Sequence, residues 1–151
     1  MATQGWRVEL FLFVPQIDNE HREIVRRSGD LCAALAAGRP KNEINVLLAT
    51  FIECVREHFT SEEEQMLATG YEGYARHHSE HQRLMAQLFS LAEGYASGAI
   101  DDASDALVRF VGSWSDDHIL FADSHFARFL HDTAQKKEAR GRGVADLTRP
   151  A

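Results

Sequence analysis

Hydrophobic positions in this chain recur every three to four residues over four separate segments, the spacing that places side chains on one face of an α-helix. The predicted helices run from Asp18 to just before Gly38, from Asn42 to Ala68, from Tyr74 to Ala96, and from Asp102 to beyond Leu130. Short connections with glycine or proline at the breaks make neighbouring helices antiparallel. The pattern therefore predicts an all-α protein, an up-down-up-down antiparallel four-helix bundle.

The two ends of the chain depart from this periodicity. Residues 1–17 contain Trp6, Phe11 and Phe13 without a helical stripe, so we expect an extended N-terminal arm packed across the bundle. Residues 18–132 form the bundle, which should begin with Asp18 as an N-cap. Residues 133–151 form a polar tail, in which residues 135–151 carry five basic side chains and two acidic ones. We expect a frayed helix followed by disorder, and a basic segment that docks on a protein partner is the alternative.

Seven side chains of metal-binding types interrupt the apolar stripes at matching depths. They are His21 in the first helix, His58 and Glu62 in the second, His77 and His81 in the third, and His118 and Asp123 in the fourth. Residues four apart lie one turn above each other on the same helix face, so the pairs in the second and third helices can each aim at one point. Turns near Pro40 and Ile100 bring all four helices' candidates to one layer. This arrangement predicts a dinuclear metal centre.

Several polar residues near these candidates do not follow the inward-facing helical stripes. Asp123 follows His118 by five residues, which on a regular helix separates their directions by about 140°. Either a π-type bulge turns Asp123 inward or it reaches around the helix flank, and we expect the flank reach. Glu63 and Glu64 should face solvent, so Glu62 is the candidate from that acidic run. Three further histidines lie off the stripes and should be surface or supporting residues: His78, His125 and His131.

Composition narrows the class of protein. A chain of 151 residues is one ordinary domain, and its formal net charge of −7 argues against nucleic acid or an anionic membrane as the main partner. The apolar run at residues 10–14 is too short to span a membrane and lacks the features of a signal peptide. We therefore expect a soluble cytoplasmic protein without membrane insertion. Cys32 and Cys54 should lie too far apart for a disulfide and act as small core residues.

Four segments together resemble hemerythrin in its bacterial form. They are Ile17 to His21, His58 to Glu63 with Met66, His77 to His81, and Trp114 through His118 and Ile119 to Asp123. The resemblance covers about residues 6–131. It implies two iron ions, of which one is bound by His77, His81 and His118 and the other by His21 and His58. Glu62 and Asp123 would bridge both ions together with an oxo or hydroxo group, and the second iron would be one ligand short, where dioxygen binds.

Ligand chemistry agrees with this implication but does not select the metal. Imidazoles suit iron, copper and zinc, so iron rests on the resemblance. Ferritin-like di-iron sites use more carboxylates, whereas this set is rich in histidine, which favours reversible binding over oxygen activation. The resemblance also places four apolar residues around the open position: Ile24, Phe59, Trp114 and Ile119. At the position three before His118, commonly leucine in the family, this chain has Ser115.

Ser115 bears on the choice between functions. We expect its hydroxyl to hold water near a bound ligand and so to speed autoxidation; the alternative is that it caps a backbone carbonyl one turn earlier and leaves the pocket dry. The leading hypothesis is a protein that carries, stores or senses dioxygen and is not an enzyme. The rivals are a di-iron enzyme acting on peroxide or nitric oxide, for which Ser115 is the main support, and an oxygen- or iron-sensing interaction module that contacts a partner through the basic tail.

Overall fold

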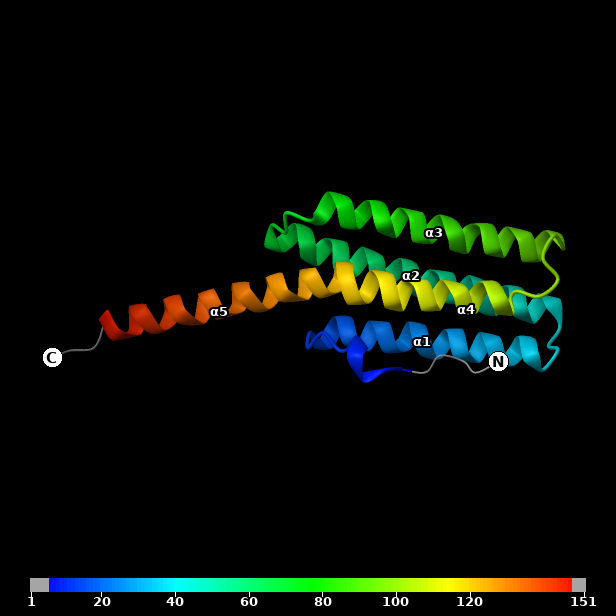
Figure 1. Ribbon diagram of the computed structural model, residues 1–151, viewed down its shortest axis with the longest axis horizontal. Helices are drawn as coiled ribbons and strands as arrows, with labels where there is room; N and C mark the ends of the chain where they lie inside the picture. Colours follow the sequence, from blue (N-terminus) through cyan, green and yellow to red (C-terminus); the bar gives the residue numbers. More distant parts are fainter. Residues whose placement is uncertain (1–5, 148–151) are drawn as a thin grey trace.

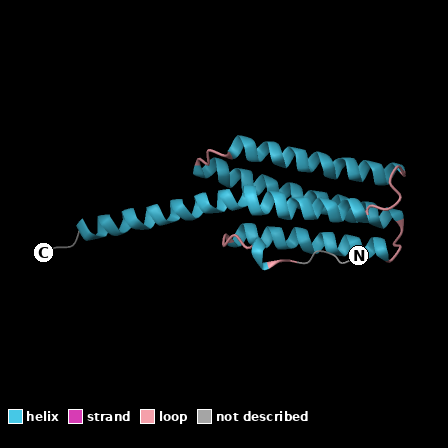
Figure 2. Cartoon of the chain, viewed as in Figure 1, coloured by secondary structure: helices cyan, strands magenta, loops and turns pink. Residues whose placement is uncertain are grey.

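The computed structural model describes residues 6–147, and within them every regular element is a helix (Figure 2). The elements are η1 (Val8–Leu10), α1 (Pro15–Ala36), α2 (Lys41–Thr69), α3 (Tyr74–Ser97), α4 (Ser104–Ser113), η2 (Trp114–Asp123) and α5 (Ser124–Leu147). The segments α4, η2 and α5 follow one another without a break and form one long fourth helix (Figure 1). Together with α1, α2 and α3 it makes the antiparallel four-helix bundle that the hydrophobic periodicity predicts.

Glycine ends the two central helices where the sequence predicts a stop. Gly70 follows α2 with φ of 67°, and Gly98 follows α3 with φ of 80°. Both are left-handed conformations that glycine adopts without the steric penalty of a Cβ atom. The connections that follow are short, so α2 and α3 lie beside each other along their lengths (Figure 1).

The start of α1 differs from the prediction. The helix begins at Pro15, three residues before Asp18, because proline has the backbone angle of the first helical turn and needs no amide partner there. Asp18 is buried, and its Oδ1 accepts a hydrogen bond from the backbone N–H of Leu12 at 2.8 Å. Asp18 therefore fixes the preceding arm onto the bundle and does not cap the helix.

The described part of the arm before α1, residues 6–14, is folded against α1 and is only partly extended. It contains the short helix η1, and Leu10 is buried. The Arg22 guanidinium lies 4.4 Å from the centre of the Phe11 ring, and Trp6 meets Phe11 edge to face at 5.3 Å. These contacts bear out the expected packing of the arm across the bundle.

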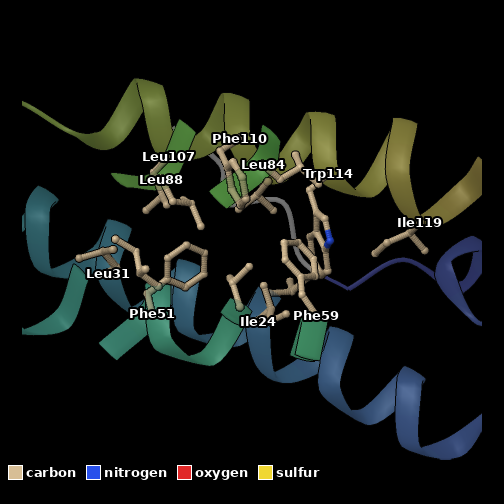
Figure 3. Close-up of a cluster of buried hydrophobic side chains, with 14 of the residues drawn as sticks. Ile24, Leu31, Phe51, Phe59, Leu84, Leu88, Leu107, Phe110, Trp114 and Ile119 are labelled. Atoms are coloured by element: carbon tan, nitrogen blue, oxygen red, sulfur yellow. The ribbon is translucent and has the colours of Figure 1, made fainter. Parts of the chain in front are cut away.

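An apolar core fills the bundle beside the polar layer. Figure 3 shows Phe51, Leu88 and Phe110 interdigitating between the helices, with the Phe51 and Phe110 rings edge to face at 6.4 Å. Cys32 and Cys54 pack at the margin of this core as free, half-buried thiols, and burial raises the pKa of both. The expectation of unpaired cysteines is confirmed.

The last helix extends beyond the bundle. Figure 1 shows α5 leaving the other helices and continuing alone, and residues 134–143 are exposed along it. The expected frayed end is instead regular helix as far as Leu147, and the expected disorder falls partly on residues 148–151, which lie outside the described part of the chain. None of the described helices is long and apolar enough to cross a membrane.

Candidate metal centre

The seven candidate side chains converge in one buried layer of the bundle. Each is at most 3% exposed. Their donor atoms form two overlapping groups, each with all of its atoms within 4.8 Å of one another: Glu62, His77, His81, His118 and Asp123 in one, and His21, His58, Glu62 and Asp123 in the other. The groups share both carboxylates but no histidine, and one group has three histidines while the other has two. The layer therefore offers two adjacent sites with different numbers of donors.

The imidazoles turn their Nε2 atoms toward this shared space. The Nε2 atoms of His21 and His58 are 3.1 Å apart, and the Nε2 atom of His118 lies 3.1 Å from that of His77 and 3.0 Å from that of His81. Nitrogen lone pairs packed this closely repel one another unless protons or cations lie between them. The donor set is therefore suited to cations at both positions.

The two carboxylates face both groups of histidines. Asp123 Oδ1 lies 2.9 Å from His77 Nε2, while Asp123 Oδ2 lies 3.1 Å from His21 Nε2. Glu62 Oε2 lies 3.2 Å from His81 Nε2 and 3.9 Å from His58 Nε2. None of the four carboxylate oxygens accepts a well-aligned hydrogen bond from the described residues. Buried, uncompensated carboxylates are costly, and two divalent ions would neutralise them.

Both shared carboxylates are ionised at neutral pH. Burial and the nearby Asp123 charge raise the pKa of Glu62, but the proximity of His77 and His81 outweighs them and lowers it to about 2. Burial also raises the pKa of Asp123, and the nearby His118 and His21 bring it well below its usual range. The two carboxylates thus contribute negative charge that favours cations within the layer, either protons on the histidines or metal ions.

Three glutamates hold histidines from outside the layer. The Nδ1 atom of His58 lies 2.7 Å from Glu20, that of His81 lies 2.7 Å from Glu63, and that of His118 lies 3.1 Å from Glu80. An Nδ1–H that donates to a carboxylate leaves the lone pair on Nε2, where a metal would bind. In each case a glutamate on one helix orients the histidine of the next helix along the chain.

Sequence reasoning missed these three supporting residues, and its placement of Glu63 in solvent is wrong. Glu63 is 19% exposed and contacts His78 as well as His81. Each glutamate directly adjoins a candidate ligand in the sequence, which turns its side chain about 100° away and toward the neighbouring helix. That adjacency is the signal that could have identified them. His78 is a supporting residue, whereas His125 is exposed.

Asp123 reaches the layer because the fourth helix is locally a π-helix, so the predicted flank reach is wrong. In η2 the hydrogen bonds join residues five apart, which places such residues on the same side. His118 and Asp123 are five apart and both buried, and Trp114 and Ile119 repeat the relation with both fully buried. The π-helix thus turns two polar and two apolar side chains inward together.

The five residues expected around an open position are all buried: Ile24, Phe59, Trp114, Ser115 and Ile119. The Phe59 ring stacks flat on His81 with centroids 3.9 Å apart, and Trp114 meets His21 edge to face at 5.3 Å. Ser115 Oγ donates a hydrogen bond to the carbonyl of Gly112 at 3.2 Å. Its hydroxyl caps the backbone, the second of the two roles considered from the sequence.

Comparison with known proteins agrees with this architecture. The family model described as the hemerythrin HHE cation binding domain matches residues 12–130. Bacteriohemerythrin of Methylococcus capsulatus is 32% identical over 131 residues, covering 86% of this chain and 98% of that protein. Myohemerythrin of Sipunculus nudus is 26% identical over 106 residues, covering 70% and 82%.

A solved structure gives the same result. The crystal structure of a leucine-to-alanine mutant of hemerythrin superposes with a TM-score of 0.76 at 30% sequence identity, and the alignment covers 85% of this chain and 97% of that one. The shared bundle, the buried histidine and carboxylate layer, and the family match together show that this chain belongs to the hemerythrin family.

Proposed function

We propose that this protein binds dioxygen reversibly at a non-haem di-iron centre. The observation that carries the proposal is the pair of donor groups that share Glu62 and Asp123, one with three histidines and the other with two. One iron would be held by His77, His81 and His118 and the other by His21 and His58. Both carboxylates would bridge the ions with an oxo or hydroxo group. The two-histidine iron would then have an open coordination position, and the reduced iron pair would supply the electrons that bind dioxygen.

The residues around the open position exclude water. Ile24, Trp114 and Ile119 are 0% exposed, and Figure 3 shows Ile24 and Phe59 below Trp114 in the bundle interior. A wall of aliphatic and aromatic side chains does not hold the water that would carry protons to a bound ligand, so the ligand can leave as it arrived. This arrangement suits carriage, storage or sensing of dioxygen.

The contact of Ser115 favours reversible binding over the di-iron enzyme. Turnover of peroxide or nitric oxide needs a proton path, and Ser115 was the sequence feature that could provide one. Because its hydroxyl already donates to Gly112, it is not free to deliver a proton to the pocket. Dioxygen binding is therefore the function that the pocket supports best.

A partner contact through the tail is supported by a separate observation. In α5, Lys136, Lys137 and Arg140 lie within five residues and share one helix face, and none has an acidic partner among the described residues. Arg142 lies on the opposite face, 3.8 Å from Glu138. We propose this basic face as a contact for an acidic protein partner. Replacing the three cations with glutamine should leave iron content and oxygen binding unchanged.

The absorption spectrum of the iron-loaded protein tests the main proposal. Protein loaded anaerobically with Fe(II) should contain two iron ions per chain. Its charge-transfer absorption should appear when oxygen is added and disappear when oxygen is removed, over repeated cycles. A single bound ion, or absorption that does not reverse on deoxygenation, would reject the proposal.

A further inference from the structure

Trp114 carries a buried polar group beside the two-histidine donor group. Its side chain is 0% exposed, and its Nε1–H has no hydrogen-bond partner among the described residues. Buried indole N–H groups are usually paired, because water solvates them in the unfolded chain and that solvation is lost on folding. An unpaired donor of this kind in a native core calls for a physical explanation.

The position of the ring supplies one. The Trp114 ring lies edge to face against both imidazoles of the smaller donor group, at 5.3 Å from His21 and 6.4 Å from His58. Phe59, whose ring lies 5.6 Å from that of His58, also places a flat ring face on His81 of the larger donor group, at an interplanar angle of 7°, and its ring carries no polar group. The aromatic wall beside the two-histidine position therefore includes a donor, and the wall beside the three-histidine position does not.

The nitrogen is on the side of the ring that faces away from Phe110. Figure 3 shows the apolar core around Phe110 on one side of Trp114 and Ile119 on the other, with the indole nitrogen directed toward the Ile119 side. His118, which belongs to the polar layer, directly precedes Ile119 on the same π-helix. The donor thus points along the bundle toward Ile119, the residue that adjoins His118 in the sequence, and away from Phe110.

Other acceptors in the layer do not take this proton. The oxygens of Glu62 and Asp123 are themselves without hydrogen-bond partners, and bridging two cations would use their lone pairs. The Nδ1 atom of His21 is likewise buried without a partner. The indole N–H is left for a group that enters the layer together with the metal.

We propose that the Nε1–H of Trp114 donates a hydrogen bond to the small ligand at the open position of the two-histidine ion. The inference rests on the proposed di-iron centre and adds a determinant of ligand specificity. A hydrogen-bond donor in an otherwise apolar pocket stabilises a ligand that carries negative charge when bound, and does little for a neutral one. The indole donor therefore favours small ligands that are anionic when bound, for which azide is the probe.

Nuclear magnetic resonance of the indole groups tests the contact directly. The chain has two tryptophans, so ¹⁵N-labelled protein loaded with diamagnetic Zn(II) gives two indole N–H signals. Azide titration should shift the Trp114 signal downfield and leave that of Trp6 in place. Because Trp6 also carries a buried indole N–H without a partner, the Trp6→Phe variant assigns the signals and serves as the matched control.

Azide affinity of the diferric protein gives the second measurement. Trp114→Phe keeps an aromatic ring but removes the donor, so azide should bind about tenfold to a hundredfold more weakly, with two iron ions still present. Trp6→Phe should bind azide as the unmodified protein does. Equal azide affinity in all three proteins, or a Trp114 signal that stays in place at saturating azide, would overturn the inference.

The outcomes separate this inference from the proposed function. Fewer than two bound ions in the unmodified protein would reject the di-iron centre itself, whereas full metal content with unaltered azide binding in Trp114→Phe would reject only the role of the indole. If Trp114→Phe fails to fold, the titration of the unmodified protein decides the question.

Discussion

The two halves of the candidate metal centre are built differently. On the three-histidine side, Glu63 and Glu80 hold two of the imidazoles through Nδ1, and Phe59 stacks on His81. On the two-histidine side, Glu20 holds His58, whereas Nδ1 of His21 has no partner among the described residues. One half therefore has two braced imidazoles and the other has one.

The bracing follows the order of the helices. A glutamate on α1 orients a histidine of α2, one on α2 orients a histidine of α3, and one on α3 orients His118 of the fourth helix. The set stops there, since no carboxylate among the described residues of the fourth helix contacts Nδ1 of His21. Each half thus has one imidazole without a supporting glutamate, His21 in one and His77 in the other, and the asymmetry of the centre arises from the missing histidine.

Removing a shared carboxylate should have the largest effect, because it acts on both halves. Asp123→Ala takes away an oxygen from each ion and one of the two buried negative charges. We expect metal content to fall from two ions per chain to one or none, measured by elemental analysis after dialysis. Glu64→Ala, at an exposed position on α2, is the control and should retain both ions.

Removing a supporting glutamate should weaken one half only. Glu63→Gln should lower the affinity of the three-histidine ion about tenfold to a hundredfold, and Glu20→Gln should do the same for the two-histidine ion. Competition titration with a chelator measures the two affinities separately. Glu64→Gln changes a neighbouring exposed glutamate in the same way and should have no effect. Equal losses at both ions in either variant would show that the halves are not independently braced.

The pH dependence should differ in sign between metal-free and loaded protein. Burial lowers the pKa of His77, but contacts with Asp123 and Glu62 outweigh it and raise the pKa from 6.5 to about 10 in the folded protein. A raised pKa stabilises the fold fully below pH 6.5, and this stabilisation is lost as the pH rises toward 10. The melting temperature of the metal-free protein should therefore fall over this range.

Metal loading should reverse that trend. Ions bind the deprotonated imidazole, so metal affinity increases as protons leave the histidines. The gap between the melting temperatures of loaded and metal-free protein should widen from pH 6.5 upward. A gap that narrows over this range would contradict the assignment of His77 as a ligand.

Ser115 should have the smallest effect. Its hydroxyl is bound to the Gly112 carbonyl, so Ser115→Leu adds apolar bulk without removing a water site. We expect unchanged metal content and a change in the autoxidation rate of less than about threefold. The rate is measured from the loss of the oxygenated absorption spectrum with time. A much slower autoxidation in the variant would instead support the hypothesis that the Ser115 hydroxyl holds water near the bound ligand, and with it the enzymatic alternative.

Local pattern predicted most of α1, α2 and α3. The ends of α2 and α3 lie within one or two residues of the prediction because glycine at the stop is a local signal. A capping residue predicts the start of α1 at Asp18, whereas the helix begins at Pro15 because proline fits the first turn. The periodicity predicts that the fourth helix extends past Leu130, as it does. The π-helix η2 inside it, however, leaves no clear trace in the periodicity.

The sequence by itself determined which residues face inward, because helical periodicity is a property of neighbouring residues and places His21, His58, Glu62, His77 and His81 on the core faces of α1 to α3. Only the tertiary structure decided how Asp123 and Trp114 are aimed, and which carboxylates brace the histidines. Those features depend on contacts between helices and on the burial of charge. A π-helix gives up the regular α-helical hydrogen bonds along its segment. Only the packed structure reveals that this distortion brings Asp123 together with the histidines of the other helices.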